Sequence, residues 1–301
     1  MARFIGVPGG SLQFSFLFLR PVGLIPLTHT RYSSIRISAS SSPMLELLRD
    51  VYRYRELIWV LAIKELKVRY KRSTLGFVWA LLHPLLMMTV LTIVFSAVMR
   101  IPVENYAIFL MCTLFPWTFF SQSMAYSTES IVGNAALLKS VYIPKLVLPV
   151  AAVMANLINF LLSLIPLALL LAVFDFPFHK TLLYLPIPVL ALTLFALGCG
   201  FFFAAVNVYF RDVTHIVQIL LAAWFYFSPI IYSLEFLPVQ YQKFFRLNPM
   251  LYILDGFRHA IYYGELPSAM SIALSLGCGM IALGVGYGVF RRYQDSFVFY
   301  V

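Results

Sequence analysis

Six long stretches of this 301-residue chain contain no Asp, Glu, Lys or Arg. They run from Ser73 to Met99, Asn105 to Thr128, Leu146 to Phe174, Thr181 to Phe210, Val213 to Leu234 and Leu266 to Phe290. Each is longer than the roughly 20 residues that an α-helix needs to cross about 30 Å of hydrocarbon. None shows the strict alternation of a barrel strand. The sequence therefore predicts an all-α integral membrane protein with six transmembrane helices.

The composition agrees with this prediction and excludes several classes of protein. Hydrophobic residues make up 61% of the chain and charged residues only 11%, whereas soluble globular domains carry roughly 25% charged residues. Such a chain has too little polar surface to fold as a soluble enzyme, a DNA-binding protein or a disordered scaffold. The net charge of +10 therefore does not indicate nucleic-acid binding, and we expect no nucleic-acid partner.

The distribution of basic residues predicts the orientation of the helices, because Lys and Arg are enriched in cytoplasmic loops. If the chain before the first span is cytoplasmic, that side holds 13 of the 22 basic residues and the opposite side holds five. The remaining four precede residue 45. Both termini are therefore predicted to be cytoplasmic.

The segment from Glu235 to Glu265 is too apolar for an ordinary loop, with residues such as Phe236, Phe244 and Leu251. It predicts one or two short re-entrant or interfacial helices before the last span. At membrane depth, such a structure is tolerated only where it is buried against protein or lines a cavity.

Residues 1–45 form an N-terminal extension for which the sequence leaves two interpretations open. The extension holds four arginines, no acidic residue and a serine-rich end, a composition that resembles an organelle transit peptide. Alternatively, the start is mis-assigned and Met44, which is followed at once by well-organised sequence, begins the protein. In either case we expect this segment to be poorly ordered.

Residues 46–72 predict a cytoplasmic interfacial amphipathic helix, which precedes a six-span domain over residues 73–301. Its apolar residues recur at spacings of three and four and share one face: they are Leu47, Val51, Tyr54, Ile58 and Leu61. The apolar part is too short to span the bilayer, and a helix of this kind lies along the membrane surface. The sequence leaves open whether it anchors the chain to anionic lipid or docks a partner.

Residue patterns for catalysis and metal binding are missing from the sequence. No Gly-Lys dipeptide is present, so there is no Walker-type phosphate-binding loop, and neither a CxxC nor a His pair at metal-binding spacing occurs. We therefore expect no catalytic residue, no metal site and no cofactor bound by this chain. Within the spans, only His83 and His215 are notable ionisable groups, which disfavours an ion channel or a proton-coupled carrier. The nearest other candidates are Asp255, Arg258 and His259.

Three stretches of sequence are more informative about the kind of protein than composition and charge are. Residues 69–85 read RYKRSTLGFVWALLHPL, residues 135–145 read AALLKSVYIPK, and residues 227–232 read FSPIIY, followed by Leu237-Pro238 and Asn248-Pro249. In this order they resemble the ABC-2 type permeases that export polysaccharides such as teichoic acid, capsule and O-antigen. The resemblance extends from about Met44 to the C-terminus.

This resemblance implies a transport permease subunit, not an enzyme, located in the bacterial cytoplasmic (inner) membrane as a multi-pass protein. It implies pairing with a second copy of the chain and with two copies of a cytoplasmic ABC ATP-binding subunit, which would hold ATP and Mg. The implied substrate is a lipid-linked glycan of the O-antigen, capsule or teichoic-acid type, moved outward across the cytoplasmic membrane, and membrane lipid is a further implied partner. The alternative within the same fold is an exporter of a small lipid or drug.

The resemblance also assigns roles to individual residues. Those implied to couple the chain to the ATPase are Leu138, Lys139, Val141, Tyr142, Ile143, Pro144 and Lys145, flanked by Arg211 and Asp212. Those implied to lead from the interfacial helix into the first span are Arg69, Tyr70, Arg72 and Trp79. The positive-inside rule alone accounts for Lys139 and Lys145. Apolar residues exposed at a cytoplasmic turn need a covering partner, which favours docking at Tyr142-Ile143-Pro144.

Two aromatic clusters are candidates for a substrate path, because aromatic faces pack against the apolar C–H faces of pyranose rings. These residues are Phe115, Trp117, Phe119 and Phe120 in the second span and Phe225, Tyr226, Phe227 and Tyr232 in the fifth. The alternatives are an aromatic belt at the membrane interface and packing against lipid. In the last span, Gly284 and Gly288 form a GxxxG motif, for which we expect packing within one subunit.

Overall fold

The computed structural model describes residues 43–69, 71, 78–94 and 103–301. Every regular element within these ranges is a helix, as the sequence predicts for the fold class. The predicted extension over residues 1–45 lies outside the described residues, apart from its last three positions.

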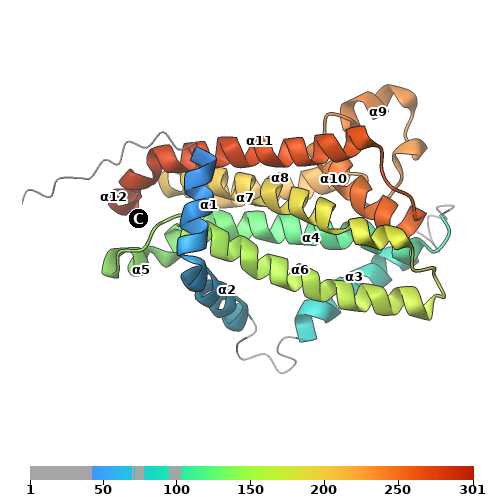
Figure 1. Cartoon of the computed structure of the whole chain (residues 1–301), viewed down its shortest axis with the longest axis horizontal. Helices are drawn as coiled ribbons and strands as arrows, with labels where there is room; N and C mark the ends of the chain where they lie inside the picture. Colours follow the sequence, from blue (N-terminus) through green and yellow to red (C-terminus); the bar gives the residue numbers. More distant parts are fainter. Residues whose placement is uncertain (1–42, 70, 72–77, 95–102) are drawn as a thin grey trace, which may run out of the picture. The chain divides into compact units, whose positions relative to one another are not determined.

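The helices are distributed along the whole described chain (Figure 1). The α-helices are α1 (Pro43–Arg53), α2 (Arg55–Arg69), α3 (Val78–Thr92), α4 (Tyr106–Glu129), α5 (Ala135–Ser140), α6 (Val147–Val173), α7 (Pro186–Tyr209), α8 (Val213–Phe227), α9 (Val239–Phe245), α10 (Pro249–Arg258), α11 (Ala269–Tyr293) and α12 (Phe297–Tyr300). The 3-10 helices are η2 (Val132–Asn134), η3 (Lys180–Tyr184), η4 (Leu234–Phe236) and η6 (Gln294–Ser296), and η5 (His259–Tyr263) is a π-helix.

Four helical segments of the described chain are long and apolar enough to cross a membrane. They are α4, α6, the η3–α7 segment and the α11–α12 segment. The fifth predicted span contains α8, which is apolar but only 15 residues long. The first predicted span contains the 15 residues of α3, and parts of that span lie outside the described residues.

α8 ends at Phe227, seven residues before the predicted end of its span at Leu234. Pro229 explains this difference, because a proline has no N–H for a helical hydrogen bond and disfavours helical geometry at the residue before it. Ser228 indeed has extended backbone angles. The chain then passes through η4 and α9 into α10, so short helices do precede the last long helix, as predicted.

α4 lies at the centre of the larger hydrophobic core, where most of its side chains are buried. It packs against α6, α7, α8 and α10. Apolar side chains face neighbouring helices on every side of α4, which accounts for the lack of a polar stripe in its sequence.

The most extensive helix pairing joins α7 to α11, and glycines permit their close approach. A Cβ atom at Gly286 would overlap the carbonyl group of Gly198, and one at Gly279 would lie 2.8 Å from the carbonyl oxygen of Ala191. A Cβ at Gly284 or Gly288 would meet nothing within 4 Å. Packing within the subunit is therefore made by Gly279 and Gly286, and not by the GxxxG pair for which we expected it.

The predicted interfacial helix is divided into α1 and α2 at Tyr54. Its apolar face packs on the chain's own helices: Leu47 and Ile58 are buried in a second core with residues of α6, α7 and α11. Trp59, Val60 and Val68 on α2 are exposed instead. The predicted periodicity is therefore used for intramolecular packing.

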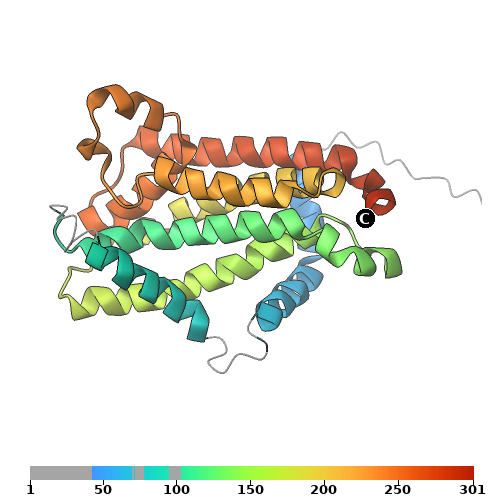
Figure 2. The ribbon, with the colours of Figure 1, turned by 180° about the vertical axis from the view of Figure 1, so that it is seen from behind.

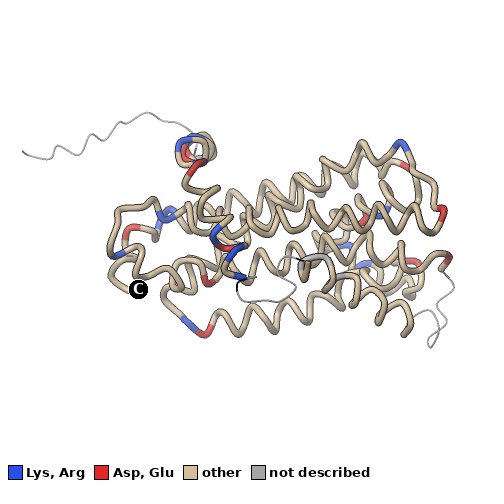
Figure 3. Tube along the Cα trace, turned by 90° about the horizontal axis from the view of Figure 1, so that it is seen from below, with Lys and Arg blue, Asp and Glu red and all other residues tan. Residues whose placement is uncertain are grey.

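Two ends of the helical bundle are distinguished by the short helices that they carry. α5 and α12 lie at one end, here called the α5 end, and α9 lies at the opposite end, the α9 end (Figures 1 and 2). Figure 3 shows long uncharged stretches of helix, with charged residues toward both ends and on α1 and α2.

Candidate coupling surface and substrate path

The segment after α5 exposes one aromatic side chain and buries the next residue. Tyr142 is 96% exposed, whereas Ile143 is only 9% exposed and joins the second core. Val141 and Lys139 are exposed, and Leu138 and Pro144 are half-buried. The buried Ile143 fixes the segment to the bundle, so that Val141 and Tyr142 are held at its surface.

One polar contact ties this segment to the end of α11, and a second joins α11 to α1 beside it. The Lys145 ammonium donates a hydrogen bond to the carbonyl oxygen of Gln294 at 2.7 Å, and Arg291 of α11 forms an ion pair with Glu46 of α1. A cavity of about 330 Å³ lies beside these two contacts. It is lined by residues of α1, by residues 142–146 and by the end of α11. Three separate parts of the chain therefore meet directly beside Tyr142.

α12 belongs to the same surface, although the sequence analysis did not single it out. It packs against α5, its Phe297 is buried, and its Phe299 is 87% exposed. The aromatic residues that follow Asp295 are the sequence signal that could have identified it. Arg211 and Asp212, between α7 and α8, are both exposed.

Arg69 at the end of α2 connects that helix to α4 and α6. Its Nη1 atom donates to the side-chain oxygens of Asn156 at 2.9 Å and Gln122 at 3.3 Å, and its guanidinium lies 4.0 Å from the ring centroid of Tyr126. Trp79 on α3 is exposed. Tyr70 and Arg72 lie outside the described residues.

The two aromatic clusters differ in exposure. In α4, all four candidate rings (Phe115, Trp117, Phe119 and Phe120) are buried. Trp117 and Phe120 pack edge-on against Trp224 of α8. At the end of α8, Tyr226 and Phe227 are exposed, while Phe225 and Tyr232 are half-buried. Only the α8 cluster therefore presents open ring faces at the surface of one chain.

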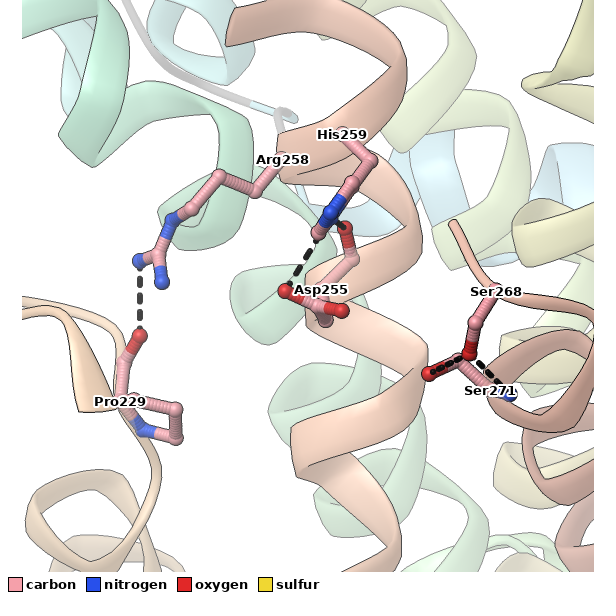
Figure 4. Close-up of polar contacts among 6 residues, drawn as sticks. All are labelled: Pro229, Asp255, Arg258, His259, Ser268 and Ser271. Atoms are coloured by element: carbon pink, nitrogen blue, oxygen red, sulfur yellow. Dashed lines mark hydrogen bonds and ion pairs between the residues drawn. The ribbon is translucent and has the colours of Figure 1, made fainter. Parts of the chain in front are cut away.

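The break after α8 is held by polar side chains from other helices (Figure 4). Arg258, itself buried, donates from Nη2 to the carbonyl oxygens of Pro229 at 2.7 Å and Ile230 at 3.4 Å. Thr113 donates to Ile230, and Tyr106 donates to the carbonyl of Ile231 at 2.8 Å. These donors satisfy carbonyls that a broken helix leaves free, as a membrane interior requires.

Metal-binding side chains are not gathered anywhere in the ranges that the structure covers: no group of three or more His, Cys, Asp or Glu residues could hold an ion there. Cys112, Cys199 and Cys278 are free thiols.

The fold thus defines a polytopic helical membrane protein with an exposed apolar turn at one end and a broken helix toward the other. The family model for ABC-2 type transporters matches residues 56–262, and the chain belongs to this family. It is 35% identical to the O-antigen export system permease protein RfbA of Myxococcus xanthus over 258 residues, which is 84% of this chain and 98% of that protein. It is 30% identical to RfbA of Klebsiella pneumoniae over 80% of this chain and 93% of that protein. It is 23% identical to the polysialic acid transport protein KpsM of Escherichia coli over 78% of this chain and 93% of that protein.

Proposed function

We propose that this chain is the membrane subunit of an ATP-driven exporter that moves a lipid-linked polysaccharide outward across the bacterial cytoplasmic membrane. Two copies of the chain would form the path, each with six membrane-spanning helices and both termini in the cytoplasm. Two copies of a separate ATP-binding subunit would supply the energy. The similarity to the O-antigen permeases over most of both chains supports the substrate class.

The observation that carries the coupling part of this proposal is the exposure of Tyr142 beside the buried Ile143. An exposed aromatic side chain at the α5 end, where α12 also exposes Phe299, needs a partner to cover it. In this proposal the ATPase subunit covers both. A push on this turn would then reach α1 and α11 through Lys145 and the Glu46–Arg291 pair.

The exposed aromatic residues of α8 are the better candidates for the sugar path than those of α4, which pack inside one chain. In the proposed dimer, Tyr226 and Phe227 would offer ring faces to the glycan as it passes.

The experiment is affinity purification of the tagged chain from native membranes, followed by mass spectrometry. The parent protein should bring down an ATPase subunit in equal amount, and Tyr142→Asp should lose it. Because Tyr142 buries almost no surface in the subunit, this change leaves the fold intact. Tyr241→Asp places the same charge on an exposed tyrosine of α9 and serves as the matched control.

Recovery of the ATPase with Tyr142→Asp would contradict docking at this turn. Recovery of the chain without any ATPase, together with transport that needs no ATP, would contradict the proposed function as a whole.

A further inference from the structure

A large cavity lies at the α9 end, opposite to the proposed coupling surface. Its volume is about 760 Å³, within the roughly 300–1,000 Å³ of sites that bind small molecules. Its walls come from the segment after α8, from α9, from α10 with η5, and from the first turns of α11. Consecutive elements between residues 229 and 274 thus surround one space.

The lining of this cavity is unusually polar for a membrane protein. Eleven of its 16 lining residues have polar side chains, whereas sites for lipids and drugs are mostly apolar. The lining holds three carboxylates, Glu235, Asp255 and Glu265, and two guanidinium groups, those of Arg246 and Arg258. An anionic group would meet the carboxylates. The wall offers polar and apolar surface in similar amounts, which suits the hydroxyl groups and C–H faces of a sugar better than an acyl chain. A neutral molecule with many hydroxyl groups matches both donors and acceptors.

One wall presents functional groups at successive helical turns: Asp255, His259 and Tyr263. The Nδ1 atom of His259 lies 3.2 Å from Oδ1 of Asp255 and 3.0 Å from its backbone oxygen. Nε2 of His259 and Oδ2 of Asp255 make no hydrogen bond within the described chain. The rings of His259 and Tyr263 lie 5.2 Å apart at 64°, so that the wall offers acceptor groups beside an aromatic ring.

The backbone and a buried cation support the same conclusion. Residues 259–263 form a π-helix, which is rare and occurs frequently at functional sites. Gly264 follows with φ of 70°. A Cβ there would overlap the ring of His179, so the end of this wall packs directly against His179. Arg258 is buried, and its Nε has no hydrogen-bond partner in the described part of the chain. Figure 4 shows Arg258 pointing to Pro229 and the neighbouring His259 pointing to Asp255.

We propose that this cavity binds a pyranose unit of the transported glycan, with Asp255 accepting hydrogen bonds from sugar hydroxyls and Tyr263 contacting the sugar ring. The inference rests on the proposed function for its source of sugar. It assigns a specific sugar-binding site in addition to the exposed aromatic path along α8.

The test is saturation-transfer NMR on the full chain in lipid nanodiscs. The probes are the methyl α-pyranosides of glucose, mannose, galactose and rhamnose, which differ in the orientation of their hydroxyls. Tetrahydropyranylmethanol, which has the ring without the vicinal hydroxyls, is the ligand control. We expect saturation of the ring protons of at least one pyranoside and none for the control.

Two substitutions test the site itself. Asp255→Asn should weaken binding about tenfold or more, the loss expected for a hydrogen bond to a charged group. Glu265 lies on an exposed loop, so Glu265→Gln should weaken binding without affecting folding. This variant therefore still tests the site if Asp255→Asn is unstable. Asp175→Asn makes the same change at an exposed residue outside the cavity and should bind as the parent does.

The proposal is overturned if no pyranoside is saturated, or if both cavity variants bind as tightly as Asp175→Asn. Binding in this assay does not require the ATPase. Failure here with normal recovery of the ATPase therefore rejects the sugar site alone. Recovery of the parent protein without any ATPase, together with transport that needs no ATP, rejects the proposed function.

Discussion

Arg258 donates a hydrogen bond of 2.7 Å to the carbonyl oxygen of Pro229, which joins α10 to the chain just beyond the end of α8. The same guanidinium lies 4.0 Å from the ring centroid of Phe109 on α4. One buried side chain therefore holds three helical segments together.

Replacing Arg258 by methionine should destabilise the protein. The carbonyl oxygen of Pro229 would lose its donor, whereas that of Ile230 keeps the hydrogen bond from Thr113. A buried unsatisfied carbonyl costs about 1–3 kcal/mol. Thermal unfolding in detergent should show a clearly lower midpoint for Arg258→Met. Arg246→Met, at an exposed position nearby, is the control, and equal midpoints for the two variants would contradict the assigned role.

The glycines of α11 should differ sharply in their tolerance of alanine. Gly286→Ala would force α7 and α11 apart, because its Cβ overlaps the backbone of Gly198, and overpacking of this kind typically costs about 1–3 kcal/mol. Gly284→Ala meets open space and should unfold at the parent's temperature or above it, since alanine favours helix by about 1 kcal/mol. Thermal unfolding of the two variants distinguishes these outcomes. A lower midpoint for Gly284→Ala than for Gly286→Ala would contradict the packing described.

Arg69→Met should loosen α2 from the bundle. The substitution removes the hydrogen bonds to the side chains of Gln122 and Asn156 and the contact with Tyr126. The backbone amide hydrogens of residues 55–69 should therefore exchange faster, by the factor that corresponds to about 1–3 kcal/mol of lost stability. Lys67→Met changes an exposed residue of the same helix and should leave exchange unchanged. If exchange in α2 is the same in both variants, Arg69 does not hold this helix.

The contribution of the Asp255–His259 pair to stability should depend on pH. The side-chain hydrogen bond to Asp255 raises the pKa of His259, with further support from the charges of Asp255 and Glu265, against an opposing effect of burial. Because the folded pKa lies above the unfolded value of about 6.5, the stabilisation is complete below that pH and is lost as pH rises through the folded pKa.

Asp255→Asn should therefore lower the unfolding temperature most in acid and progressively less toward alkaline pH. Asp175→Asn is the matched control and should show no such trend. A difference between parent and Asp255→Asn that stays constant across the titration would contradict the coupling of these two residues.

Several features could be predicted from the sequence because they depend on local chemistry. Charge-free runs predict apolar helices, and the apolar segment from Glu235 to Glu265 predicts short helices before the last long helix. The three stretches that resemble ABC-2 permeases predict the family, which the similarity over residues 56–262 confirms.

Other features depend on how helices face one another, which periodicity alone does not determine. Gly284 and Gly288 have the spacing of a packing motif, but the rotation of α11 turns Gly286 toward α7 instead. Trp117 and Phe120 are aromatic in a long apolar helix, and only the positions of α6, α7 and α8 around α4 decide that they are buried. The roles assigned to the coupling and path residues stay predictions.

α11 is a continuous helix of 25 residues, about 37 Å long at 1.5 Å per residue. Its first turns, at Met270 and Ser271, line the polar cavity at the α9 end, and its last turns pair with α1 through Arg291. If α11 tilts as one body, a tilt imposed at Arg291 would displace Ser271 as well and change the width of that cavity. The distance between the two ends is thus bridged by one element, without a relay of intermediate side chains.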